Sequence, residues 1–152
     1  MKGNSVIANG NQPNGRFVTA ILSGVLSPGQ QLELKPGVEP VNGNFTYQAC
    51  SAAGANEPAF ILMEDNSQGS SITTPYTDGA LAQLYVPISG DELNLLYKNI
   101  AGTADAFTIG QKVVVDATGK FVANTGTPQR IHQCEETVAA ITADTLVCTR
   151  WN

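Results

Sequence analysis

Gly29-Gln30-Gln31-Leu32-Glu33-Leu34 is the stretch of this chain that says most about its fold. A glycine and a polar pair are followed by apolar residues at alternate positions, which is the period of a half-buried β-strand. The pattern returns as Gly90-Asp91-Glu92-Leu93-Asn94-Leu95 and as Gly110-Gln111-Lys112-Val113-Val114-Val115. Ser27-Pro28 precedes the first copy and Thr108-Ile109 precedes the last. We therefore expect three glycine turns, each of which opens a short strand.

The copies at Gly29 and Gly110 also lead into similar segments. Each leads through a turn to a phenylalanine, Phe45 or Phe121, and then to a cysteine, Cys50 or Cys134. This weak similarity indicates either two pseudo-equivalent hairpins in one barrel or only the general likeness of β-hairpins. The uneven spacing of the three copies argues against a solenoid, which needs a constant period. One barrel is favoured, because half of this chain would be small for a core of its own.

The composition favours a mainly β protein. The chain has 152 residues, of which 42% are apolar and only 14% are charged, and it contains 15 glycines. Soluble domains average roughly 25% charged residues. Abundant Asn, Gln, Ser, Thr and Gly suit short strands, tight turns and broad polar contacts. We expect one compact β-barrel or β-sandwich-like domain over residues 17–152, with few short helices.

Residues 1–16 form a segment of different composition. They are rich in asparagine and glycine, and Val6-Ile7-Ala8 is their only apolar cluster. So little apolar surface does not offset the entropy of ordering the segment. The segment is then a frayed terminus or a flexible arm that orders against a partner. In the second case Val6 and Ile7, together with Phe17, are the expected contact residues.

Charge and hydropathy exclude several kinds of partner. The net charge is −5 and the eight basic residues are scattered, whereas binding to phosphates needs clustered Lys and Arg. No apolar run approaches the roughly 20 residues of a membrane helix. The first residues lack the apolar core of a signal peptide. We expect a protein made in the cytoplasm that binds neither nucleic acid nor membrane.

The sequence offers little for catalysis. His132 is the single histidine, and Cys50, Cys134 and Cys148 show no CxxC spacing. These residues do not make up a zinc site, and the thiols are expected to be buried as small apolar groups. We expect no metal, no cofactor and no enzymatic activity. The alternative is a cysteine-dependent hydrolase that uses Cys134 with His132.

The order of several segments resembles tailed-phage head decoration proteins, also called capsid cement proteins. The resemblance rests on Ser27–Leu34, on Ala59–Asp65, and on Tyr76–Leu96 with its Val86-Pro87-Ile88-Ser89-Gly90-Asp91-Glu92. The second Gly-Gln hairpin and a last strand that ends at Trp151 complete it. It spans most of residues 17–152, and its motifs are short.

The resemblance implies a small β-tulip-type domain, often a homotrimer, that sits on the outer surface of an expanded phage head. Such proteins clamp neighbouring subunits of the major capsid protein and have no enzymatic activity or cofactor. Residues 1–16 match the family's N-terminal arm in composition only. The rival is another virion β-module, such as a tail or receptor-binding component. A receptor-binding module should expose clustered aromatic side chains, whereas Phe60, Tyr85 and Phe121 lie in strand patterns typical of a core.

Overall fold

The fold is built from β-strands throughout the part of the chain that the computed structural model describes. That part comprises residues 5–8, 15–52, 59–65, 71–100, 105–126 and 132–152. It contains strands β1 to β12, and none of its residues forms a helix. The expected mainly β class is confirmed. In these residues there is accordingly no helix with the length and hydropathy to cross a membrane.

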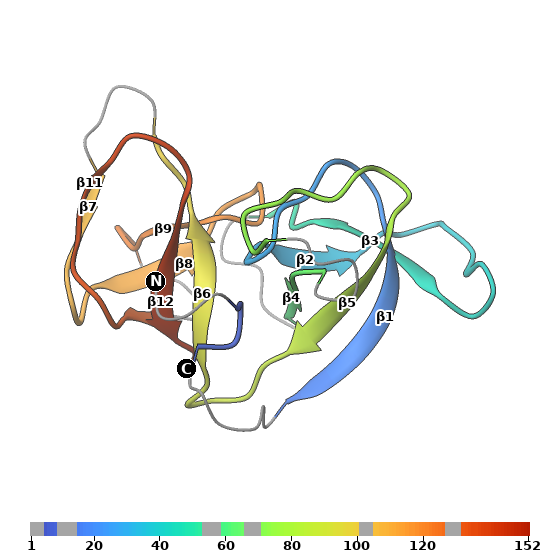
Figure 1. The fold of residues 1–152 in the computed structure, drawn as a ribbon, viewed down its shortest axis with the longest axis horizontal. Helices are drawn as coiled ribbons and strands as arrows, with labels where there is room; N and C mark the ends of the chain where they lie inside the picture. The colour runs from blue at the N-terminus through green and yellow to red at the C-terminus, as the bar shows by residue number, and fades with distance from the viewer. Residues whose placement is uncertain (1–4, 9–14, 53–58, 66–70, 101–104, 127–131) are drawn as a thin grey trace.

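Five strands from the first half of the chain close into a barrel, which we call barrel 1 (Figure 1, right). Its strands lie in the order β1-β3-β2-β4-β5, and β5 pairs back to β1. β1 and β3 run parallel, and the other neighbours run antiparallel. The strands are β1 (Arg16–Leu22), β2 (Gln31–Leu34), β3 (Phe45–Ala49), β4 (Phe60–Leu62) and β5 (Leu81–Val86).

Five strands from the second half close into barrel 2 (Figure 1, left). Its order is β6-β9-β8-β10-β12, and β12 pairs back to β6. Beside it lies a two-stranded ribbon of β7 and β11. The strands of barrel 2 are β6 (Glu92–Tyr97), β8 (Lys112–Val115), β9 (Phe121–Ala123), β10 (His132–Cys134) and β12 (Thr145–Arg150). The ribbon strands are β7 (Asp105–Phe107) and β11 (Val138–Ile141).

The two barrels have the same topology. β1, β2, β3, β4 and β5 correspond in order to β6, β8, β9, β10 and β12, and the single parallel pair is β1–β3 in one and β6–β9 in the other. The hairpin after Gly29 therefore corresponds to the hairpin after Gly110, as the sequence suggested, but the two lie in separate barrels. The expectation of one barrel is wrong on this point.

The three glycine turns share one set of hydrogen bonds. In the first, Gln30 N–H donates to Ser27 O (3.2 Å) and Ser27 N–H donates to the Gln30 side-chain oxygen (2.5 Å). Gly29 N–H donates to Leu62 O (2.9 Å), and Leu62 N–H donates to Gln30 O (3.0 Å). Gly29 has a φ of 83°, which a type II turn requires at its third residue. The turn thus fixes β2 against β4 before the strand begins.

The other two copies repeat these bonds. Gln111 accepts from Thr108 N–H (3.1 Å) and Asp91 accepts from Ile88 N–H (3.0 Å) through their side chains. Gly110 N–H donates to Cys134 O (2.9 Å), and Cys134 N–H donates to Gln111 O (2.9 Å). In the same way Gly90 N–H donates to Trp151 O (2.8 Å), and Trp151 N–H donates to Asp91 O (2.8 Å). The side chain after the glycine is therefore a cap for the turn, which explains why the motif has Gln or Asp at this position.

Barrel 1 buries side chains on both surfaces of β4 and β5. Its interior holds a cluster that includes Leu22, Leu32, Phe60, Leu62 and Leu84. The alternate residues Ile61 and Tyr85 point outward and belong to a larger cluster with the interior of barrel 2. The run 59–63 is thus buried on both faces. This shared layer supplies apolar burial that a small barrel alone would lack.

The segment Ser5–Ala8 differs from the expectation of an arm that orders only against a partner. Val6 is fully buried in the shared core, and Ile7 forms a bridge with Leu93 of β6. The Glu64 carboxylate accepts from Ser5 Oγ (2.5 Å) and Val6 N–H (2.9 Å). Asn94 donates from its backbone N–H to Val6 O (2.7 Å) and from its side-chain amide to Ser5 O (2.6 Å). Ala8 N–H donates to Glu92 O (2.8 Å). A carboxylate distant in sequence thus holds residues whose composition alone predicted no fixed place. The rest of the expected arm, residues 1–4 and 9–14, lies outside the described residues.

Candidate functional site

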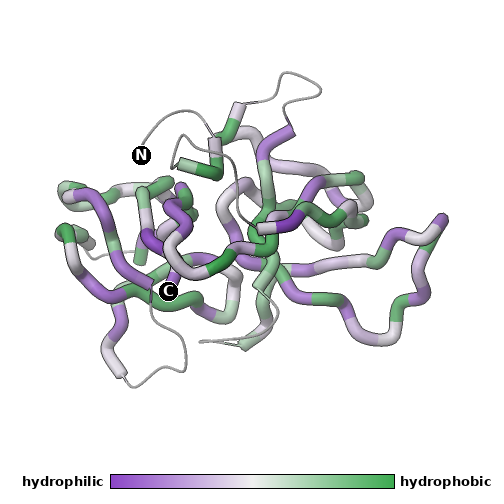
Figure 2. Tube along the Cα trace, turned by 90° about the horizontal axis from the view of Figure 1, so that it is seen from below, coloured by the Kyte–Doolittle hydropathy of each residue, from purple (hydrophilic) through white to green (hydrophobic). Residues whose placement is uncertain are grey.

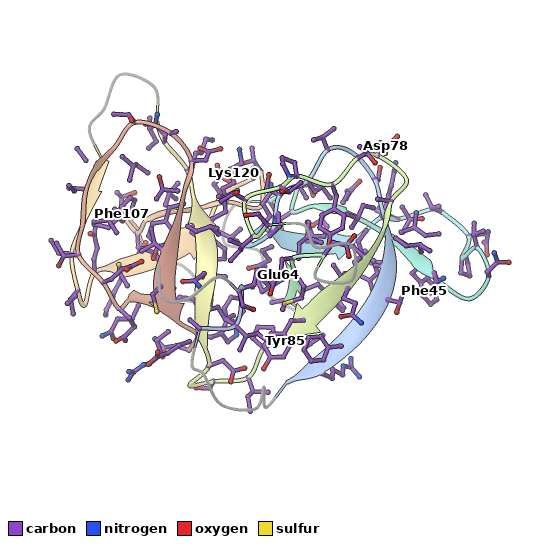
Figure 3. The ribbon with its side chains drawn as sticks, in the orientation of Figure 1. Phe45, Glu64, Asp78, Tyr85, Phe107 and Lys120 are labelled. Carbon is purple, nitrogen blue, oxygen red and sulfur yellow. The ribbon has the colours of Figure 1, made fainter. Side chains whose placement is uncertain are left out.

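A groove lies beside the outer face of β1 and β5, and we call it the β1–β5 groove. Its volume is about 570 Å³, and the segment at Ser5 and Ile7 contributes to its lining. Phe17 and Leu81 supply exposed apolar surface, with 44% and 61% of each residue exposed. Figure 3 shows Glu64 between the two barrels and Tyr85 of β5 below it. An open groove whose walls combine apolar and polar side chains is suited to contact with another protein.

The structure brings two of the three predicted contact residues together. Ile7 and Phe17 both line the β1–β5 groove. The Phe17 ring packs on Tyr85, with centroids 5.2 Å apart. Val6 lies elsewhere, because its side chain is part of the core. Ile7 and Phe17 therefore stay candidate contact residues, while Val6 acts by anchoring the segment that carries Ile7.

Two acidic side chains are part of the lining of this groove. Glu64 and Asp65 line it beside Tyr76, whose hydroxyl donates to Met63 O (3.0 Å). Burial, with the Asp65 and Glu64 carboxylates nearby, raises the pKa of Tyr76 to about 12. The tyrosine is therefore neutral at physiological pH, and its hydroxyl is a hydrogen-bonding group in the lining of the groove. The sequence did not identify Leu81 and Glu64 as lining residues, since only the pairing of β1 with β5 and the return of the N-terminal segment place them here.

A second exposed feature is the connection between β2 and β3, residues 35–44, which we call the long hairpin. It projects from barrel 1 on the side away from barrel 2 in both views (Figures 1 and 2). Asn42 and Gly43 have φ of 52° and 80°, as a tight type I′ hairpin turn requires. Exposed apolar side chains lie along and beside it, at Leu34, Val38, Val41 and Phe45. The Asn42-Gly43 pair is a local turn signal, but no local signal shows that the hairpin projects.

The thiols and the histidine lie in the interior. Cys50, Cys134 and Cys148 are free and buried. Burial raises the pKa of Cys134, and burial with the nearby Glu33 charge raises the pKa of Cys50 to about 12. His132 is also buried, where its ring stacks on Trp151 at 3.8 Å. A neutral, enclosed thiol is a poor nucleophile, so this geometry gives the hydrolase alternative no support. The described residues hold no cluster of three metal-ligating side chains.

Comparison with known proteins identifies a similar fold. No protein-family model matches the chain, and neither does any curated protein. Among solved structures, the N base of the head fibre protein gp8.5 of bacteriophage phi29 is similar, with a TM-score of 0.52 and 11% identity. The match covers 91% of this chain and 97% of that one. At this identity the similarity concerns the fold, and it extends over nearly the whole of both chains.

Proposed function

We propose that this chain is a phage capsid decoration protein that binds the outer surface of the expanded head. The observation that carries the proposal is the shared fold with the base of a phage head fibre over nearly its full length. The order of motifs in the sequence, which resembles head decoration proteins, supports it independently. The low charge content and the open groove, with exposed apolar side chains at Phe17 and Leu81, fit a protein that works through surface contacts. The major capsid protein is the proposed partner, and the virion is the proposed location.

In this proposal the protein stabilises the head by clamping neighbouring capsid subunits, and it acts as a homotrimer. Several weak contacts from one trimer add through their effective concentration. The β1–β5 groove, with Ile7 and Phe17, is the proposed capsid-binding surface. No catalytic step, cofactor, nucleic acid or membrane takes part. The fold match favours attachment to the head over a role as a tail or receptor-binding component, because the matched protein is a head fibre base.

The proposal is tested by co-sedimentation of the purified protein with DNA-free expanded heads of the same phage. Phe17→Asp places a charge in the proposed surface, and Ile88→Asp places one at a site of similar exposure outside the groove. We expect wild type and Ile88→Asp to pellet with heads and Phe17→Asp to bind about tenfold more weakly or less. Heads that pellet without wild-type protein would refute the proposed function. Equal binding of all three proteins would refute only the proposed surface.

A further inference from the structure

The duplicated barrels make one contact within the chain whose counterpart is left open. In barrel 2 the connection between β8 and β9, residues 116–120, packs against the start of β2 in barrel 1. Gln31 N–H donates to Gly119 O (2.8 Å), and the Gln30 amide donates to Thr118 O (3.0 Å). A Cβ at Gly119 would lie 2.3 Å from Gln31 O, so the contact is close. The hairpin of one barrel thus covers the glycine turn of the other.

The corresponding turn in barrel 2 is not covered in this way. Gln30 and Gln31 are buried. Of their counterparts in barrel 2, Gln111 is half-buried and Lys112 is exposed. The Gln111 side-chain oxygen caps its turn as Gln30 does. Its amide nitrogen, which in Gln30 donates to the hairpin, has no acceptor in the part of the chain that the structure describes. The turn at Gln111 therefore carries the same amide donor as the turn at Gln30, but no hairpin carbonyl among the described residues accepts from it.

The long hairpin is the element of barrel 1 that corresponds to residues 116–120. Both connections end in the sequence Gly-x-Phe, at Gly43 and Gly119, and both glycines have a positive φ, 80° and 75°. A Cβ at Gly43 would meet nothing within 4 Å, in contrast to Gly119. In barrel 2 the five residues 116–120 suffice to join β8 and β9, which correspond to β2 and β3. Closure of barrel 1 therefore does not need a connection as long as residues 35–44. The extra length is therefore free to make a contact outside its own barrel.

The hairpin and the open turn complement each other but lie at opposite ends of the molecule. Beside Gln111 is a cavity of about 390 Å³ lined by Ile100, Phe107 and Val122. It suits the apolar Val38 and Val41, and the exposed Lys112, which follows Gln111, suits the exposed Glu39. Figure 3 places Phe107 at one end of the long axis and Phe45, at the base of the hairpin, toward the other. The two surfaces are thus too far apart to meet within one chain.

We propose that the long hairpin of one copy docks on the Gln111 turn of barrel 2 in a second copy. The contact repeats between copies the contact that residues 116–120 make within the chain. It joins two different surfaces, so it propagates head to tail and closes into a ring when the rotation permits. A ring of three copies would be the homotrimer of the proposed function, which this inference deepens without depending on capsid binding.

The test uses purified protein without heads and measures mass by sedimentation. Val41→Asp alters the hairpin, Ile100→Asp alters the cavity, and Val25→Asp alters an exposed turn residue outside both. We expect wild type and Val25→Asp to associate, and each of the other two to dissociate with a Kd raised about tenfold or more. Thermal unfolding of each variant checks that it is folded.

Mixing the two defective variants decides between this contact and any other. Ile100→Asp keeps an intact hairpin and Val41→Asp keeps an intact cavity, so the mixture should form a heterodimer that neither forms alone. A symmetric contact in which the hairpins meet each other would not be restored by mixing. Monomeric wild-type protein, association that survives Val41→Asp, or a mixture that stays monomeric would each overturn the inference, and none of these results bears on binding to heads.

Discussion

At the scale of single residues, the three glycine turns are the strongest link between sequence and structure. Gly29 and Gly110 occupy equivalent turns with φ of 83° and 86°, but their surroundings differ. A Cβ at Gly29 would lie 2.7 Å from Leu146 and 2.8 Å from Asn94 O, across the contact with barrel 2. A Cβ at Gly110 would meet nothing within 4 Å. The same motif is therefore a local turn in one barrel and a packing element in the other.

This difference provides a matched pair of substitutions. Gly110→Ala should cost about 1–2 kcal/mol of unfolding free energy, because an alanine is strained at positive φ. Gly29→Ala carries the same strain and also collides with backbone, so it should cost clearly more, by about 2 kcal/mol or above. Urea unfolding of both variants measures the difference. Equal losses would show that the contact at Gly29 is not tight.

Asp116 predicts how stability changes with pH. Burial tends to raise the pKa of Asp116, but hydrogen bonds from Lys98, Thr118 and Lys120 outweigh it and hold the pKa below its ordinary value. A carboxyl with a depressed pKa stabilises the fold above its unfolded pKa, and this contribution is lost as pH falls through the folded pKa. We expect Asp116→Asn to be less stable near neutrality and to lose less stability on acidification.

The measurement is unfolding free energy from about pH 6 to about pH 3. Lys98→Met removes one partner of Asp116 and should shift the acid loss toward higher pH. An acid slope that is the same in wild type and Asp116→Asn would contradict the role assigned to this carboxylate.

At the scale of elements, the short strands and turns could be predicted and their partners could not. The glycine turns, the run 59–63 and the hairpin at 116–123 are visible in the sequence because periodicity and turn residues are local signals. The same signals mark the equivalence of Gly29 and Gly110. They do not show that each turn belongs to its own barrel, since closure depends on the distant pairing of β1 with β5 and of β6 with β12.

The segment Ser5–Ala8 shows the limit of composition as a guide. Val6 is fully buried, and a single buried carboxylate, Glu64, binds the segment. Neither fact is visible in a window of asparagine and glycine. For the same reason the sequence grouped Val6 with Ile7 and Phe17 as predicted contact residues, although Val6 is in the core, and it held no indication of the groove that Ile7 and Phe17 line.

Val6→Ala tests this placement. Loss of two buried methyl groups, with the void they leave, should cost about 2 kcal/mol of unfolding free energy. Val25→Ala is the matched control, because Val25 is 73% exposed and should lose almost nothing. Thermal or urea unfolding measures both. A Val6→Ala variant as stable as wild type would mean that the segment is a free arm after all.

At the scale of the whole molecule, two copies of one small barrel share a core and leave different surfaces exposed. Barrel 1 presents the long hairpin and the outer face of β1 and β5, while barrel 2 presents the open turn at Gln111. Duplication thus provides the protein with surfaces for more than one neighbour. This arrangement fits a molecule that contacts its own copies on one side and a capsid on another, which is the function proposed above.

The clamping of capsid subunits is the central claim, and the heat resistance of expanded heads tests it most directly. Heads are heated with and without saturating protein, and their disruption is followed by light scattering, with Ile88→Asp as a second binding-competent sample. We predict that heads carrying the protein stay intact to a higher temperature than bare heads. Heads that bind the protein and disrupt at the same temperature as bare heads would contradict the clamping role.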